Sequence, residues 1–211
     1  MITASYYQDK CIGVFGLART GVAAVHALVA SGAKVMAWDD KPESCAAVGA
    51  FATNLYEADF SGLDALLLAP GVPLTHPAPH ALVNKAIEHG VPLISDLDVF
   101  QAGRSGLRPH KTVAITGTNG KSTTTALIHH VVTAVGQPAA MGGNIGTGAL
   151  SLNPLPKKGV YVFELSSFQL DLTRSFDADV AVLLNVTPDH LDRHGNMPAY
   201  VAAKSRLFDM Q

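Results

Sequence analysis

The feature that most constrains this 211-residue chain is a glycine turn between a short apolar run and a helix-like segment. Residues 113–115 are apolar, Gly117 to Gly120 form the turn, and Lys121 opens the next segment. A strand, a glycine turn and a helix in this order direct backbone amides and a lysine toward an anion. The standard phosphate loop has four residues between its glycines, whereas this turn has two, and an ordinary glycine turn is the alternative. The pattern predicts a nucleotide-phosphate site made by Gly117, Thr118, Asn119, Gly120, Lys121, Ser122 and Thr123.

Composition narrows the class of protein. Hydrophobic residues make up 48% of the chain and the formal net charge is −2, which favours a large core and argues against a nucleic-acid partner. No apolar run approaches the roughly 18 residues of a membrane span, and the N-terminus lacks the pattern of a signal peptide. The two cysteines, Cys11 and Cys45, have no metal-binding spacing. We therefore expect a cytoplasmic protein with reduced thiols and no membrane partner.

The chain alternates buried strands with helix-like segments, which predicts an α/β fold with parallel sheets covered by helices on both faces. After residues 103–109, read as a linker, the alternation starts again. The sequence stops within a predicted helix, so we expect a fragment of a longer protein. Strands are expected at 11–15, 34–38, 63–69, 91–94, 112–116, 160–165 and 180–185, and helices at 22–30, 84–90, 124–135 and 199–210.

The first α/β unit carries a second glycine turn. Gly16-x-Ala18-x-x-Gly21 departs from the dinucleotide-binding pattern because alanine replaces the middle glycine. In that pattern the middle glycine allows the backbone to approach a pyrophosphate closely. Asp39 follows Gly21 at about the spacing of a ribose-binding acid. NAD, another nucleotide, the diphosphate of a nucleotide sugar and a purely structural turn all remain open.

Polar residues follow strands in the second unit as well. Glu164 ends an apolar strand, where a carboxylate needs either a metal such as Mg²⁺ or a salt-bridge partner. Asn144 lies in a glycine cluster that is either a ligand loop or a tight turn. Residues 189–194 hold two Asp and two His without a zinc spacing, so one or two of them are expected to bind Mg²⁺ or substrate. By pattern alone, Lys204 reads as a solvated helix lysine.

Four strings together resemble the Mur ligases of bacterial cell-wall synthesis: GTNGKST at 117–123, GGNIG at 142–146, ELSSFQL at 164–170 and NVTPDHLDRH at 185–194. The first string is shared with folylpolyglutamate synthases, and the others discriminate more. Within the family the strings are most similar to the members that add D-glutamate to UDP-N-acetylmuramoyl-L-alanine. The resemblance covers nearly the whole chain, although Ala18, Arg19 and Ala69 depart from the expected pattern.

The resemblance implies a three-domain enzyme. Residues 1–104 would be the Rossmann-like domain that binds the uridine diphosphate of the substrate. Residues 105–211 would be the first part of the P-loop-type, ATP-binding central domain. A C-terminal domain for the amino acid would be absent, so we expect this chain alone to be inactive, and we expect a monomer. The implied reaction is transfer of the ATP γ-phosphoryl group to a carboxylate, followed by attack of the D-glutamate amine on the acyl phosphate.

The resemblance also implies residue roles. Residues 117–123 would bind ATP, and Lys121, Asn144, His190 and Lys204 would be catalytic. Lys204 aligns with a lysine that is carbamylated in the family, which would turn it into an anionic metal ligand. The implied Mg²⁺ ligands are Ser122, Glu164, His190 and Lys204. The implied substrate-binding residues are Thr20, Asp39, Asp40, Gly71, Asn144 and His190.

Three other functions remain open at this stage. One is another Mur-type or folylpolyglutamate-type amide ligase. A second is an NAD-dependent oxidoreductase built on the first unit, which would leave the 117–123 string unexplained. The third is a nucleotide-binding module without catalysis.

Overall fold

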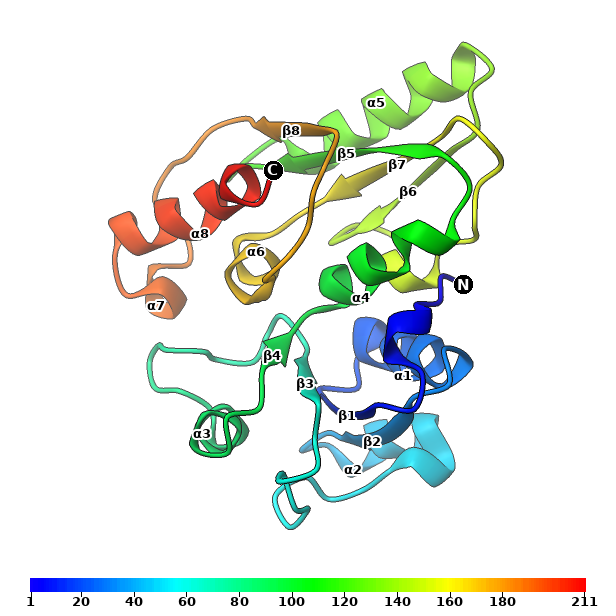
Figure 1. Ribbon diagram of the computed structural model, residues 1–211. Coiled ribbons are helices and arrows are strands. Elements are labelled where there is room, and N and C mark those ends of the chain that lie inside the picture. The colour runs from blue at the N-terminus through cyan, green and yellow to red at the C-terminus, as the bar shows by residue number, and fades with distance from the viewer.

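The computed structural model describes residues 1–211 and contains two four-stranded parallel sheets (Figure 1). The first sheet has the order β2-β1-β3-β4, and every pairing in it is parallel. Its strands alternate with helices along the chain: β1 Cys11–Phe15, α1 Arg19–Ala30, β2 Lys34–Trp38, α2 Pro42–Cys45, β3 Ala65–Leu68, α3 Ala81–Glu88, β4 Leu93–Ile94 and α4 Asp96–Gly103.

The second sheet has the order β6-β7-β5-β8, again with parallel pairings only. Helix α5 lies along one face of this sheet, and α6 and α8 lie on the other side, nearer the first sheet (Figure 1). Its elements are β5 His110–Thr116, α5 Lys121–Ala134, β6 Ala139–Gly143, β7 Gly159–Glu164, α6 Ser167–Leu172, β8 Val180–Leu183, α7 Leu191–His194 and α8 Met197–Asp209. Short 3₁₀ turns occur at η1 Ser5–Tyr7, η2 Ala46–Phe51, η3 Arg104–Gly106 and η4 Ala149–Ser151. None of the helices is both long and apolar enough to span a bilayer.

The α/β fold with parallel sheets is confirmed, and the expected strands and helices are present with shifted ends. Five elements escaped prediction: the strand β6 and the helices α2, α4, α6 and α7. Two of them begin at capping boxes, formed by Ser95 with Asp98 and by Ser166 with Gln169. These capping signals are visible in the sequence. The strand β6 ends in two glycines and is only half-buried at its start, so it lacks the apolar run that marks a buried strand.

Close packing explains the glycines of the first turn. Gly16 has a φ of +92°, and a Cβ there would lie 2.5 Å from the Cβ of Ala69. A Cβ on Gly21 would lie 1.8 Å from the carbonyl oxygen of Gly16. Close packing against the residue after β3 accounts for Gly16, and packing of α1 against the turn accounts for Gly21, whether or not a ligand binds there.

The two sheets share one hydrophobic core through α4. The ring of Phe100 is fully buried, and its centroid lies 5.4 Å from that of Tyr161 and 4.9 Å from that of Phe163, both on β7. Asp98 accepts hydrogen bonds from the backbone amides of Arg174 (2.9 Å) and Ser175 (2.7 Å), in the segment after α6. Helix α4 thus joins the two units through both apolar and polar contacts.

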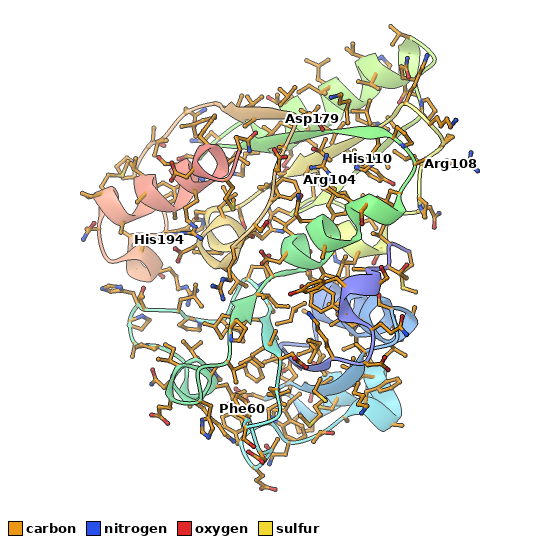
Figure 2. The ribbon with its side chains drawn as sticks, in the orientation of Figure 1. Phe60, Arg104, Arg108, His110, Asp179 and His194 are labelled. Atoms are coloured by element: carbon orange, nitrogen blue, oxygen red, sulfur yellow. The ribbon has the colours of Figure 1, made fainter.

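The expected linker at 103–109 is wrong in its first half, which is structured and attached to the second sheet. Gly103 belongs to α4, and Arg104 donates to the carbonyl of Asp177 and to the carboxylate of Asp179. Figure 2 shows Arg104, His110 and Asp179 close together beside β5. The domain boundary after residue 104 stays a prediction.

Asp96 is expected to make folding stability depend on pH. It is buried at the start of α4, and neither carboxyl oxygen has a hydrogen-bond partner. Burial, with the nearby charge of Asp98, raises its pKa to about 6. A raised pKa means that stability is fully present below the unfolded pKa, near 4, and is lost as pH rises through about 6.

We therefore expect Asp96→Asn to stabilise the protein at pH 8, by on the order of 2–3 kcal/mol, with the gain shrinking toward pH 4. Urea unfolding at several pH values measures this, with the exposed Glu57→Gln as control. A variant less stable than the native chain at pH 8 would contradict the assignment.

Candidate functional site

The carboxyl ends of the second sheet's strands bring together the residues singled out in the sequence. The chain leaves β5 into the Gly117–Gly120 turn, β6 into Asn144, and β8 into the segment 184–190, while Glu164 is the last residue of β7. Strand β5 lies between β7 and β8. Ligands of open parallel sheets bind beyond these strand ends, where the strand order reverses.

The turn after β5 is built around two glycines in left-handed conformations. Gly117 has a φ of +152°, and a Cβ there would lie 3.1 Å from the Cβ of Leu184. Gly120 has a φ of +84° and is the N-cap of α5, which begins at Lys121, three residues earlier than predicted. Both conformations favour glycine, so the short turn passes directly into the helix.

Asn185, immediately after β8, fixes the turn from the side. Its carbonyl accepts from the amide of Thr118, its Oδ1 accepts from the amide of Asn119, and its Nδ2 donates to the carbonyl of Asn119, each at 3.0 Å. The first helical bond of α5 runs from the amide of Thr124 to Gly120. The amides open to an anion are therefore those of Gly120–Thr123 at the helix N-terminus, and those of Thr118 and Asn119 are already used.

Two lysines converge on the carbonyl oxygen of Gly117. The Nζ of Lys121 donates to it at 3.0 Å and to the carbonyl of Thr118 at 2.7 Å. The Nζ of Lys204, from α8, donates to the same Gly117 oxygen at 2.8 Å. Two ammonium groups this close repel each other, which favours an anion beside them.

Lys204 is only 2% exposed, so reading it as a solvated helix lysine is wrong. Burial, followed by the charge of Lys121, lowers its pKa to about 8. Its ammonium lies 4.8 Å from the ring centre of Tyr200, whose hydroxyl is 3.0 Å from the Oγ1 of Thr118. Helix α8 is thereby attached to the glycine turn.

Glu164 and Asn144 form a pair across adjacent strand ends. The Nδ2 of Asn144 donates to Oε1 of Glu164 at 2.8 Å, and its backbone amide donates to the Glu164 carbonyl at 2.8 Å. Gly143 permits this approach, since a Cβ there would lie 2.4 Å from that carbonyl oxygen. Glu164 is 2% exposed and makes no ion pair, so the salt-bridge alternative is wrong.

The buried Oε2 of Glu164 has no hydrogen-bond partner, which suits a cation ligand. No cluster of three or more His, Cys, Asp or Glu side chains is close enough to hold a metal alone. Mg²⁺ commonly takes one or two protein carboxylates together with phosphate oxygens, so the residues present fit Mg²⁺ held jointly with a phosphate. Ser122 lies exposed on the first turn of α5.

His190 lies in the segment after β8, exposed and with a left-handed φ of +51°. Its Nε2 lies 3.5 Å from Oδ2 of Asp189, and its ring centre is 4.8 Å from that of Phe168 on α6. His194 is instead buried, with its Nε2 3.0 Å from Oγ of Ser167 (Figure 2). Burial lowers the pKa of His194.

A cavity of about 260 Å³ joins these residues. All four predicted catalytic side chains, Lys121, Asn144, His190 and Lys204, line it. Asp189, from the candidate cluster at 189–194, also lines it. The sequence did not single out the remaining lining residues, Ser166, Ser167, Phe168 and Tyr200, or the supporting Asn185.

The predicted substrate residues of the first unit lie at the ends of its strands. Thr20 is in the first turn of α1, whose first helical bond starts at Val22, so the amides before it are open to an anion. Asp39 accepts from the amides of Leu17 (2.6 Å) and Lys41 (2.9 Å) and so holds the turn itself. Gly71 follows β3 and has open space where a Cβ would be.

Asp40 belongs to a polar cluster that the sequence did not reveal. Its carboxylate accepts from the hydroxyl of Tyr56 at 2.8 Å and lies 3.6 Å from Nε2 of His80. Burial, and then this hydrogen bond, raises the pKa of Tyr56 to about 12. His80 in turn caps α3 by accepting from the amide of Leu82. The three side chains come from separate segments, which is why no local pattern marks them.

Comparison with known proteins gives a family match and several similar relatives. Residues 115–211 match the Mur ligase middle domain family. The chain is 53% identical over 213 residues to UDP-N-acetylmuramoylalanine–D-glutamate ligase of Phenylobacterium zucineum, covering 98% of this chain and 45% of that protein. It is 50% identical to the ligase of the same name from Sphingopyxis alaskensis, covering 100% and 49%. The chain thus spans about half the length of the curated relatives it matches.

Solved structures support the fold. The UDP-N-acetylmuramate:L-alanyl-gamma-D-glutamyl-meso-diaminopimelate ligase from Neisseria meningitides has a TM-score of 0.55 at 19% identity, over 96% of this chain and 68% of that one. The UDP-N-acetylmuramate-alanine ligase from Thermotoga maritima has a TM-score of 0.54 at 21% identity, over 95% and 47%. These structures show the fold, whereas the match of residues 115–211 and the sequences of the relatives show that the chain belongs to the Mur ligase family.

Proposed function

We propose that this chain is the part of an ATP-dependent ligase that binds the nucleotide substrate and the ATP phosphates. The proposed reaction adds D-glutamate to UDP-N-acetylmuramoyl-L-alanine through an acyl phosphate. One observation carries the proposal: Lys121, Asn144, His190 and Lys204 line one cavity beside a phosphate-binding turn. The names and identities of the close relatives support the choice of substrates.

The amides of Gly120–Thr123 hold the ATP phosphates at the N-terminus of α5, and Lys121 stabilises the charge that develops on the γ-phosphoryl group. Asn144, held by Glu164, and His190 orient the muramoyl-alanine carboxylate across the cavity. The physical task is to bring two anions together and keep them aligned, which makes positioning the main contribution of these side chains.

Mg²⁺, when bound, supplies charge neutralisation between the phosphates and the carboxylate. Ser122, Glu164, His190 and Lys204 are the residues proposed to hold it. Lys204 fits this role in a carbamylated form, because its lowered pKa increases the fraction of neutral amine that reacts with carbon dioxide. The buried, unpartnered oxygen of Glu164 fits as a second anionic ligand.

The first unit, residues 1–104, is proposed to bind uridine diphosphate at Thr20, Asp39, Asp40 and Gly71, and residues 105–211 to bind ATP. The open amides of α1 suit the diphosphate, whereas Asp39 contributes mainly by holding the turn. We propose a monomer located in the cytoplasm, where ATP and nucleotide-linked sugars are available.

Product analysis of the protein at its full natural length tests this function. With ATP, UDP-N-acetylmuramoyl-L-alanine and D-glutamate, we expect ADP, phosphate and the D-glutamyl amide by mass spectrometry, and no product with L-glutamate. Failure to bind any uridine nucleotide would favour a folylpolyglutamate-type ligase. Binding of NAD without ATP turnover would favour the oxidoreductase.

Lys121→Ala in the full-length protein is expected to lower turnover by at least about 100-fold, because the transition-state charge loses its ammonium partner. Uridine-nucleotide binding should stay nearly unchanged, since Lys121 lies in the second unit. Steady-state kinetics and UDP titration measure the two effects, with the exposed Lys157→Ala as the matched control. Retained turnover would refute the role.

Asn185→Ala is expected to weaken ADP binding about threefold to tenfold, because two hydrogen bonds that order the phosphate turn are lost. Calorimetric titration with ADP measures the change. Asn153→Ala, which removes an equally exposed amide far from the turn, should leave the ADP affinity as it is. Equal ADP affinity in both variants would show that the Asn185 side chain does not order the site.

A further inference from the structure

Two arginines connect the proposed substrate-binding segments of the first unit with segments next to the cavity in the second unit. The Nη1 of Arg19, at the start of α1, donates to the carbonyl of Gly146 at 2.7 Å. The Nη2 of Arg193, on α7, donates to the carbonyl of Val72 at 3.2 Å. Each bond joins residues more than 120 positions apart, one on each unit.

Each arginine bond joins a segment with a proposed substrate contact to a segment that borders the cavity. Arg19 precedes Thr20, and Gly146 is two residues after Asn144. The two segments are neighbours here, since a Cβ on Gly148 would lie 3.9 Å from Oγ1 of Thr20. Arg19 therefore links the segment of Thr20, a proposed diphosphate contact, to the loop that carries Asn144.

Arg193 links the other side. Val72 directly follows Gly71, and the Arg193 guanidinium lies 5.1 Å from the ring centre of Phe168, which lines the cavity and contacts His190. Close by, a Cβ on Gly195 would lie 2.6 Å from the imidazole of His76, so the loop after β3 fits closely against α7.

Helix α4 joins the two units in another way. There, Asp98 and the pair of Ser95 with Thr173 are buried and hydrogen-bonded, which makes a fixed connection. At the cavity, the two arginines donate to neutral backbone carbonyls, Arg19 in an exposed bond and Arg193 in a partly buried one. Such bonds contribute little to global stability but can set the spacing of two surfaces.

We propose that Arg19 and Arg193 are positioning residues. They set the distance between the proposed diphosphate-binding residues of the first unit and the cavity that Asn144 and His190 line. The inference rests on the proposed function, in which one substrate carries its diphosphate on the first unit and its carboxylate in the second. A substrate that spans two sites gains affinity only when their spacing is held near its own length. Ligands that occupy one site alone gain nothing from the two arginines.

Binding of whole and partial ligands separates these cases in the full-length protein. For Arg19→Ala and Arg193→Ala, we expect the affinity for UDP-N-acetylmuramoyl-L-alanine to fall about threefold to tenfold each. The affinities for UDP alone and for ADP should stay within about twofold of the unaltered protein. In kinetics, KM for the muramoyl substrate should rise while KM for ATP is unchanged.

Arg19→Lys keeps one donor and should recover part of the loss, which a general folding defect would not allow. Arg108→Ala is the matched control, because this side chain extends from the molecular surface away from both units (Figure 2). An equal loss of UDP affinity would show that Arg19 or Arg193 contacts the nucleotide directly, and unchanged muramoyl-substrate affinity would show no positioning role. Either result overturns the inference. If the unaltered protein binds neither UDP nor the muramoyl substrate, the proposed function fails and the inference with it.

Discussion

The carbonyl oxygen of Gly117 is the point on which the site depends, because it accepts hydrogen bonds from both Lys121 and Lys204. One ammonium comes from the helix that follows the turn, and the other comes from α8, more than 80 residues later. Their mutual repulsion costs free energy that an anion at the N-terminus of α5 offsets. The same carbonyl therefore organises the turn and concentrates positive charge where phosphates are proposed to bind.

Parallel strand pairing brings the rest of the site to this point. Register places Ile115 beside Glu164 and Glu164 beside Gly143, so the ends of β5, β7 and β6 coincide. Asn144 then bonds to Glu164, and the segment after β8 reaches the turn through Asn185. Because each strand contributes one or two polar residues at its end, the cavity is assembled from segments that are distant in sequence.

The two units are joined by contacts of different kinds. Helix α4 contributes Phe100 to the core of the second sheet and Asp98 to its loops, whereas near the cavity the units are joined by arginine bonds to backbone carbonyls, one exposed and one partly buried. A buried connection through α4 and less buried bonds near the cavity suit a protein whose proposed substrate extends over both sheets. The buried Asp96 on α4 shows that this connection also carries a polar cost.

The sequence by itself determined every strand except β6, the glycine turn and the family, because these depend on local runs of apolar residues and on contiguous strings. Through resemblance it also proposed Lys121, Asn144, His190 and Lys204 as catalytic candidates, although pattern alone read Lys204 as solvated. Only the tertiary structure showed that Lys204 is buried against Gly117, that Asn185 uses the amides of Thr118 and Asn119, and that Asp40 pairs with Tyr56 and His80. Those contacts depend on strand order and on the packing of α8. They join residues that are far apart in the sequence and meet only when the sheets are formed, so no local sequence pattern predicts them.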